Sequence, residues 1–219
     1  MFRMPTALRN TFDDPYLHGT VDFGNVPDVV GLETVRANGV EVGMEPGPYS
    51  LSLSVTTPGA TSAAASAPSR DKRLHVNGYL VGGLGLVGLS WYKDPVKSTL
   101  ERTFSALYGG LSLGRVTGLA EVDAIKEQDP TTGASTSKRG LLAEVNFLLT
   151  RGQNIKLQYE AFDPNTNVDK NISDRSSIVY EPFVTSYLQL RGGVRRSEGP
   201  RELTGLNGTT LFMEVHFMY

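Results

Sequence analysis

Ionisable and amide side chains stand at every second position in several stretches of the sequence, with apolar residues between them. In one stretch, Lys156, Gln158 and Glu160 alternate with aliphatic and aromatic residues. Residues two apart in an extended chain point to the same side, so these polar groups would share one face of a strand. Because burying many ionisable groups in a dry core would be prohibitive, the spacing indicates a hydrated interior.

The polar faces of the expected strands carry more acids than bases. As the lining of a channel they would supply seven acids and three bases, namely Glu41, Glu121, Asp123, Glu144, Glu160, Glu181 and Glu214 with Lys156, Arg191 and Arg195. A lining rich in carboxylates favours cations. Alternatively, the charges pair across a narrow barrel and fill it with salt bridges and hydrogen bonds. Both interpretations stay open, whereas anion selectivity is disfavoured because no basic ladder is visible.

Side chains that could perform catalysis are sparse. The absence of cysteine excludes thiolate catalysis, Cys-ligated zinc and a disulfide framework. The three histidines are His18, His75 and His216, and no nucleophile and base stand together with any of them. We therefore expect no enzyme activity, no catalytic residue and no cofactor.

One segment has a weak resemblance to a calcium-binding loop. Asp163, Asn165, Asn167 and Asp169 place oxygen-bearing side chains at alternate positions. The segment departs from the EF-hand pattern because Val168 stands where glycine is needed and because no glutamate stands at the twelfth place. A solvated loop is the favoured interpretation, and no metal site is predicted.

Length and charge bound the class of protein. The 219 residues suffice for one domain over 1–219, and 21 Lys plus Arg against 23 Asp plus Glu give a net charge of −2. The chain has no excess of positive charge that would attract nucleic acid, so no nucleic-acid partner is expected. The first residues lack the charged start and apolar core of a secretory signal, so we expect either a mature chain or missing upstream sequence.

The elements that would position the polar residues are strands. The most hydrophobic window, Leu80–Trp91, is interrupted by glycines and is far shorter than the roughly 20 apolar residues of a spanning helix. The period-two pattern predicts strands over 2–9, 38–45, 48–57, 73–82, 84–92, 101–113, 115–126, 139–150, 153–162, 174–182, 185–196 and 208–219. The sequence therefore predicts an all-β protein.

The connections between these strands alternate in length. Tight turns are expected at 46–47, 82–83, 114–115, 151–153 and 182–184, and longer polar loops at 10–37, 58–72, 93–100, 127–138, 163–173 and 197–207. Short turns at one end and long loops at the other are typical of membrane barrels, whereas Greek-key sandwiches do not sort their connections this way. The sequence predicts a transmembrane antiparallel up-and-down β-barrel with about 12 strands in this chain.

The last strand carries the most specific resemblance. Leu211, Met213, Val215, Phe217 and Tyr219 share one face, and the chain stops on an aromatic residue. Such an ending resembles that of Gram-negative outer-membrane porins, and the stretches 39–49, 157–164 and 180–184 are similar to a poorly characterised porin group. The resemblance implies that the barrel-assembly machinery recognises Phe217 and Tyr219, and that the C-terminus is periplasmic.

The same resemblance implies a function. Members usually have about 16 strands, so two alternatives stay open, a complete barrel of about 12 strands or the C-terminal portion of a longer one. We expect a porin-type channel in the outer membrane, surrounded by its lipid, for passive diffusion of small hydrophilic solutes or ions through a mildly acidic lumen. The alternative is a barrel that sheathes a partner such as a periplasmic multihaem cytochrome in an electron conduit. A homo-oligomer also stays open.

Overall fold

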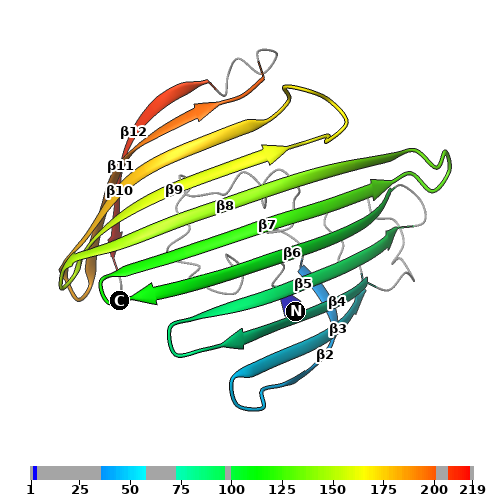
Figure 1. Ribbon diagram of the computed structural model, residues 1–219, viewed down its shortest axis with the longest axis horizontal. Coiled ribbons are helices and arrows are strands. Elements are labelled where there is room, and N and C mark those ends of the chain that lie inside the picture. The colour runs from blue at the N-terminus through cyan, green and yellow to red at the C-terminus, as the bar shows by residue number, and fades with distance from the viewer. Residues whose placement is uncertain (1, 4–35, 58–72, 97–99, 201–206, 218–219) are drawn as a thin grey trace.

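The chain folds into one antiparallel sheet in which every strand pairs with its neighbours in sequence (Figure 1). The computed structural model describes residues 2–3, 36–57, 73–96, 100–200 and 207–217. Its 12 strands are β1 (Phe2–Arg3), β2 (Arg36–Met44), β3 (Tyr49–Thr57), β4 (Arg73–Val81), β5 (Gly85–Val96), β6 (Leu100–Leu113), β7 (Val116–Gln128), β8 (Ser135–Thr150), β9 (Gln153–Asp163), β10 (Ser173–Thr185), β11 (Leu188–Glu198) and β12 (Gly208–Phe217). Among these residues, no helix is long and apolar enough to cross a membrane.

The up-and-down connectivity confirms the predicted fold class, and the strand boundaries are close to those expected. The strand predicted over 2–9 is described only at Phe2–Arg3, and residues 4–9 lie outside the described part. The turn predicted at 182–184 is wrong, because β10 continues to Thr185 and turns at Ser186 and Tyr187. Pro182 has no backbone N–H to donate to a neighbouring strand. The strand nevertheless continues past it, and its pairing with β11 becomes irregular between Phe183 and Thr185.

The two ends of the sheet differ in their connections. At one end, the tight-turn end, the five connections comprise two to four residues. Gly47, Gly114 and Gly152 adopt positive φ angles of 67°, 62° and 79° there, which a side chain would disfavour. At the opposite, loop end, the loops predicted at 93–100 and 127–138 are too long, since β5 to β8 extend to leave only 97–99 and 129–134 between strands.

The 129–134 connection is organised by a single carboxylate. Asp129 Oδ1 accepts hydrogen bonds from the backbone amides of Thr131 at 2.7 Å and Thr132 at 3.2 Å. These amides hold the pKa of the Asp129 carboxyl below its ordinary value, because they stabilise its charged form. The side chain therefore closes the turn as an anion at neutral pH.

Apolar and polar residues occupy opposite faces of the sheet. Paired residues point to the same side, so the register carries each face across all strands. The outer face is apolar and exposed, and includes Val42, Leu53, Leu89, Leu107 and Leu211. The other, inner face carries buried polar and charged groups, an arrangement typical of a membrane barrel and opposite to that of a soluble protein.

Aromatic rings lie over glycines at two places on the inner face. Gly88 pairs with Tyr108, and a Cβ added at Gly88 would lie 2.6 Å from the Tyr108 hydroxyl oxygen. Gly193 pairs with Phe212, and a Cβ there would lie 2.8 Å from the Phe212 ring. Each ring packs over the backbone of its glycine, which has no side chain of its own to cover that part of the strand.

Replacing Gly88 by alanine should therefore displace the Tyr108 ring. We expect the Gly88→Ala variant to lose about 1–3 kcal/mol of unfolding free energy, as overpacked sites do, in urea titrations of detergent-solubilised protein. Gly118→Ala is the matched control, because its added Cβ would meet no atom closer than 4.0 Å. Equal stabilities of the two variants would contradict the packing role of the ring.

Candidate functional site

The predicted channel-lining residues all fall on the inner face of the sheet. Pairings such as Glu41 with Ser54, Glu144 with Gln158 and Arg191 with Glu214 place them there across β2 to β12. Four further charged residues with described side chains share this face but were not predicted, namely Arg102, Glu127, Lys138 and Arg175. Among residues whose side chains the structure describes, the inner face thus carries eight acids and six bases, and the register adds Asp94 and Arg73 to the same face.

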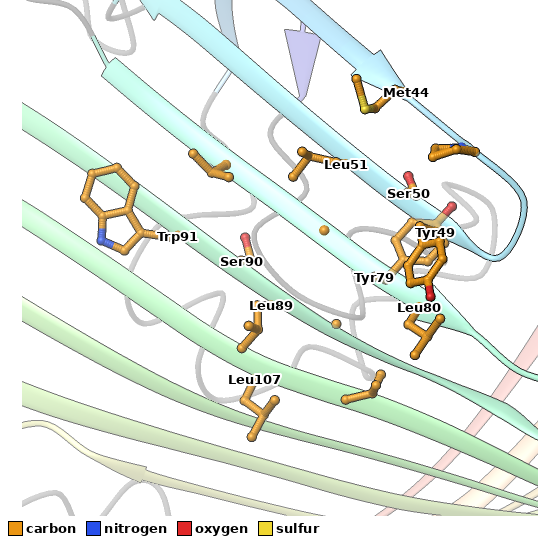
Figure 2. Close-up of a pocket in the computed structure, with 15 residues that line it drawn as sticks. Met44, Tyr49, Ser50, Leu51, Tyr79, Leu80, Leu89, Ser90, Trp91 and Leu107 are labelled. Atoms are coloured by element: carbon orange, nitrogen blue, oxygen red, sulfur yellow. The ribbon is translucent and has the colours of Figure 1, made fainter.

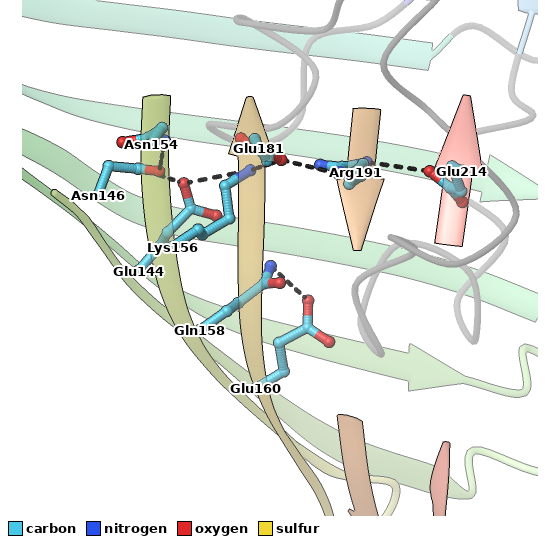
Figure 3. Close-up of polar contacts among 9 residues, drawn as sticks. All are labelled: Glu144, Asn146, Asn154, Lys156, Gln158, Glu160, Glu181, Arg191 and Glu214. Carbon is cyan, nitrogen blue, oxygen red and sulfur yellow. Dashed lines mark hydrogen bonds and ion pairs between the residues drawn. The ribbon is translucent and has the colours of Figure 1, made fainter. Parts of the chain in front are cut away.

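A ladder of alternating charges crosses five strands near the tight-turn end (Figure 3). Lys156 Nζ lies 3.9 Å from Glu144 Oε1 and 3.4 Å from Glu181 Oε1. Arg191 Nε donates to Glu181 Oε1 at 2.7 Å, and its Nη1 lies 3.6 Å from Glu214 Oε2. Each base lies between two acids, so the five groups carry one net negative charge. We call them the charge ladder.

Amides extend the charge ladder at its β8 end. Asn146 Nδ2 donates to Glu144 Oε1 at 2.6 Å, and Asn154 Nδ2 donates to Asn146 Oδ1 at 3.0 Å. Further toward the loop end, Gln158 Nε2 donates to Glu160 Oε1 at 3.2 Å (Figure 3). Hydrogen bonds of this kind satisfy carboxylate oxygens that would be costly to leave unpaired in a buried setting.

A second group of ion pairs lies at the loop end. Glu127 accepts from Arg102 at 2.8 Å through Oε1 and contacts Lys138 Nζ at 2.7 Å through Oε2. Arg175 Nη1 lies 3.7 Å from Glu160 Oε2 on the neighbouring strand. The inner charges for which ion pairs are described therefore lie mostly against a charge on the neighbouring strand. Pairing across a narrow barrel stays a prediction.

Two carboxylates on β7 lie between these groups. Glu121 and Asp123 are each 3% exposed. Asp123 pairs with Ala106 on β6 and Gly140 on β8, so small residues flank it on both sides. Its Oδ1 atom is buried with no hydrogen-bond partner among the residues that the structure describes.

The four missed residues have two separate explanations. Glu127 and Lys138 lie beyond the predicted strand ends at 126 and 139, so the sequence placed them in a loop. Arg102 and Arg175 lie within predicted strands, and counting in steps of two from Phe104 and Ser177 would have found them. The missed set contains three bases and one acid, so the acidic excess is smaller than predicted.

The calcium-loop candidate has its side chains engaged in turns. Asp163 Oδ1 accepts the Asn165 amide at 3.0 Å, and Asn165 Oδ1 accepts the Asn167 amide at 3.1 Å. Within the described part of the chain, no group of three or more His, Asp or Glu residues is placed to hold a metal. His18 lies outside that part, and so do the side chains of His75 and His216.

Aromatic residues gather on the outer face at the tight-turn end. Tyr49, Phe147, Tyr180 and Phe217 are exposed there, and we call them the aromatic girdle. Phe217 pairs with Leu188 beside the last tight turn, so β12 ends at that end of the sheet. Tyr219, the other residue of the predicted assembly signal, lies outside the described part.

Comparisons with known proteins decide the fold. No family model matches the sequence, and no curated protein matches it. The structure aligns with an anion-selective porin from Comamonas acidovorans with a TM-score of 0.65 and 12% identity, over 80% of this chain and 54% of that one. The chain has the porin fold.

Two other porin-type structures support the same conclusion. A porin refined at 1.8 Å resolution aligns with a TM-score of 0.65 and 12% identity, over 84% of this chain and 62% of that one. OccK11 (OpdR) of Pseudomonas aeruginosa aligns with a TM-score of 0.53 and 14% identity, over 77% of this chain and 58% of that one. The chain thus spans less than two thirds of each, and identities this low carry the fold but no substrate.

The charge ladder yields a stability prediction at Arg191, which is 4% exposed and lies between two acids. Replacing it by methionine leaves Glu181 and Glu214 buried without their shared base. We expect Arg191→Met to lower the unfolding free energy by about 3 kcal/mol, measured by urea denaturation in micelles.

The matched control removes an arginine from an exposed pair. Arg196 contacts Glu198 at 2.5 Å, but both side chains are more than half exposed. Arg196→Met should cost less than about 1 kcal/mol, because water screens such a pair. Similar losses in the two variants would show that the charge ladder does not stabilise the sheet.

Proposed function

We propose that this chain forms the wall of an outer-membrane channel for passive diffusion of small hydrophilic solutes or ions. The observation that carries the proposal is the division of the sheet into an apolar outer face and a charged inner face. An apolar exterior suits lipid, and charges on the interior suit a passage that water and ions enter. The same proposal makes the chain a channel rather than an enzyme.

The orientation is part of the proposal. In porin-type barrels short turns face the periplasm and long loops face outward, which supports a periplasmic C-terminus. The aromatic girdle at the tight-turn end suits the lipid–water boundary on that side. Phe217, which is exposed on the outer face of β12, then serves with Tyr219 as the signal for the barrel-assembly machinery.

The lumen is proposed to favour cations mildly. Among described side chains, eight acids against six bases leave a small negative excess on the inner face, and most of this charge is cancelled in pairs. Glu41 is an exposed inner-face acid whose hydrogen bond comes from the neutral hydroxyl of Ser54, at 2.5 Å. Its charge is therefore available to passing ions. The anion selectivity of the Comamonas porin belongs to that protein.

Planar-bilayer recording tests both parts of the proposal. The refolded protein should conduct, and a salt gradient should give a reversal potential that favours cations. Glu41→Gln should shift this potential toward zero, because it removes an exposed carboxylate that has no ion pair among the described side chains. Glu198→Gln, which changes an exposed outer-face acid near the loop end, should leave it unchanged. Absence of conductance at all voltages would sink the channel proposal.

The alternative of a sheath around a periplasmic multihaem cytochrome stays a prediction. Any haem would belong to the partner, because the chain has no cysteine for covalent haem attachment. Haem absorbance in gently extracted protein would favour the sheath, and its absence together with conductance would favour the open channel.

A further inference from the structure

A shallow groove of about 670 Å³ crosses the outer face of the sheet between β2 and β6 (Figure 2). Its outer-face lining includes Met44, Tyr49, Leu51, Leu89 and Trp91. These side chains are aliphatic, aromatic or a thioether, so the groove offers almost no hydrogen-bonding group to an occupant. We call it the Gly78 groove, after the residue at its floor.

Gly78 keeps the groove open. Its register neighbours on the outer face are Leu51 on β3 and Leu89 on β5, which stand on either side of the gap that the missing side chain leaves. A Cβ at this position would lie 3.3 Å from the Ser50 carbonyl oxygen and 3.4 Å from Leu51 Cδ1. A larger side chain would fill the hollow and press on Leu51.

The position of the groove along the strands indicates its occupant. It begins at the row of Tyr49, Leu80 and Val87, level with the aromatic girdle, and continues through the row of Gly78 to that of Trp91. The girdle marks the lipid–water boundary of this fold, and the rows beyond it lie in the apolar band. The groove is continuous with the membrane-facing surface and leads inward from the level of lipid headgroups.

We propose that the Gly78 groove holds an acyl chain of one membrane phospholipid as a bound, structural lipid. An apolar chain is complementary to the lining, and its headgroup would stay at the level of Tyr49, where water begins. The inference rests on the transmembrane fold and not on conductance, so it can fail or hold independently of the proposed channel.

The test uses Trp91, which lines the groove and is the only tryptophan of the chain. Phosphatidylcholine with brominated acyl chains is titrated into the full chain in detergent micelles, and Trp91 fluorescence is followed, since bromine quenches indole on contact. We expect quenching that saturates at a single lipid per chain. Gly78→Leu should make it weak and unsaturable.

Gly118→Leu is the matched control. Gly118 also lies on the outer face, between Leu111 and Val145, but does not line the groove. The Gly118→Leu variant should bind the brominated lipid as the wild type does. β-sheet circular dichroism confirms folding, and should Gly78→Leu not fold, Leu51→Phe fills the same groove from its other side.

Two results would overturn the inference. One is quenching that rises linearly with lipid in the wild type, or that is identical in the wild type and Gly78→Leu, because Trp91 would then meet only exchanging lipid. The other is a wild-type dimer that resists quenching and dissociates in Gly78→Leu, because a second copy of the chain would then cover the groove.

Discussion

Backbone hydrogen bonding is the constraint on which the rest of the structure depends. Inside a bilayer no water is available to pair with an N–H or C=O group, so every strand must find its partners within the sheet. In the described part of the chain, each strand from β3 to β11 meets this requirement by pairing with a neighbour on both sides, with two-residue to four-residue turns at one end, and β12 pairs with β11.

The paired backbone then determines where the side chains go. Since alternate residues point to opposite faces, an apolar residue facing lipid places its neighbour on the inner face. The polar inner residues are satisfied by one another, as in the charge ladder from Glu144 to Glu214. The alternation fixes two faces, and the lipid outside decides which of the two is apolar. Charge pairing is therefore a consequence of the fold and also the source of its functional surface.

The sequence was most informative where this alternation is regular. The period-two pattern predicted the up-and-down topology and the shared face of all ten candidate lining residues, including Arg191 and Glu214. It failed where strands extend past the apolar band, as at Glu127 and Lys138. There β7 and β8 remain hydrogen-bonded, but the sequence no longer alternates apolar with polar residues. It also misplaced a turn at Pro182. Proline lacks a backbone N–H donor, but the strand does not have to change direction there.

Charge pairing was less predictable than the fold. Which acid meets which base depends on register and on side-chain reach, and neither is visible in composition. Arg102 and Lys138 both reach Glu127, although they are far from it and from each other in the sequence. A count of acids and bases therefore does not give the pairing, which the register supplies for the described residues.

The central claim is that the inner face borders water while the outer face borders lipid. Val40, Glu41 and Val42 are all exposed on β2 and alternate between the two faces. Because the chain has no cysteine, single cysteines can report on each position without background. The most direct test is labelling of Glu41→Cys and Val42→Cys by a charged, water-soluble thiol reagent in lipid vesicles. We expect rapid labelling at 41 and little at 42, and equal or reversed labelling would contradict this assignment of the two faces.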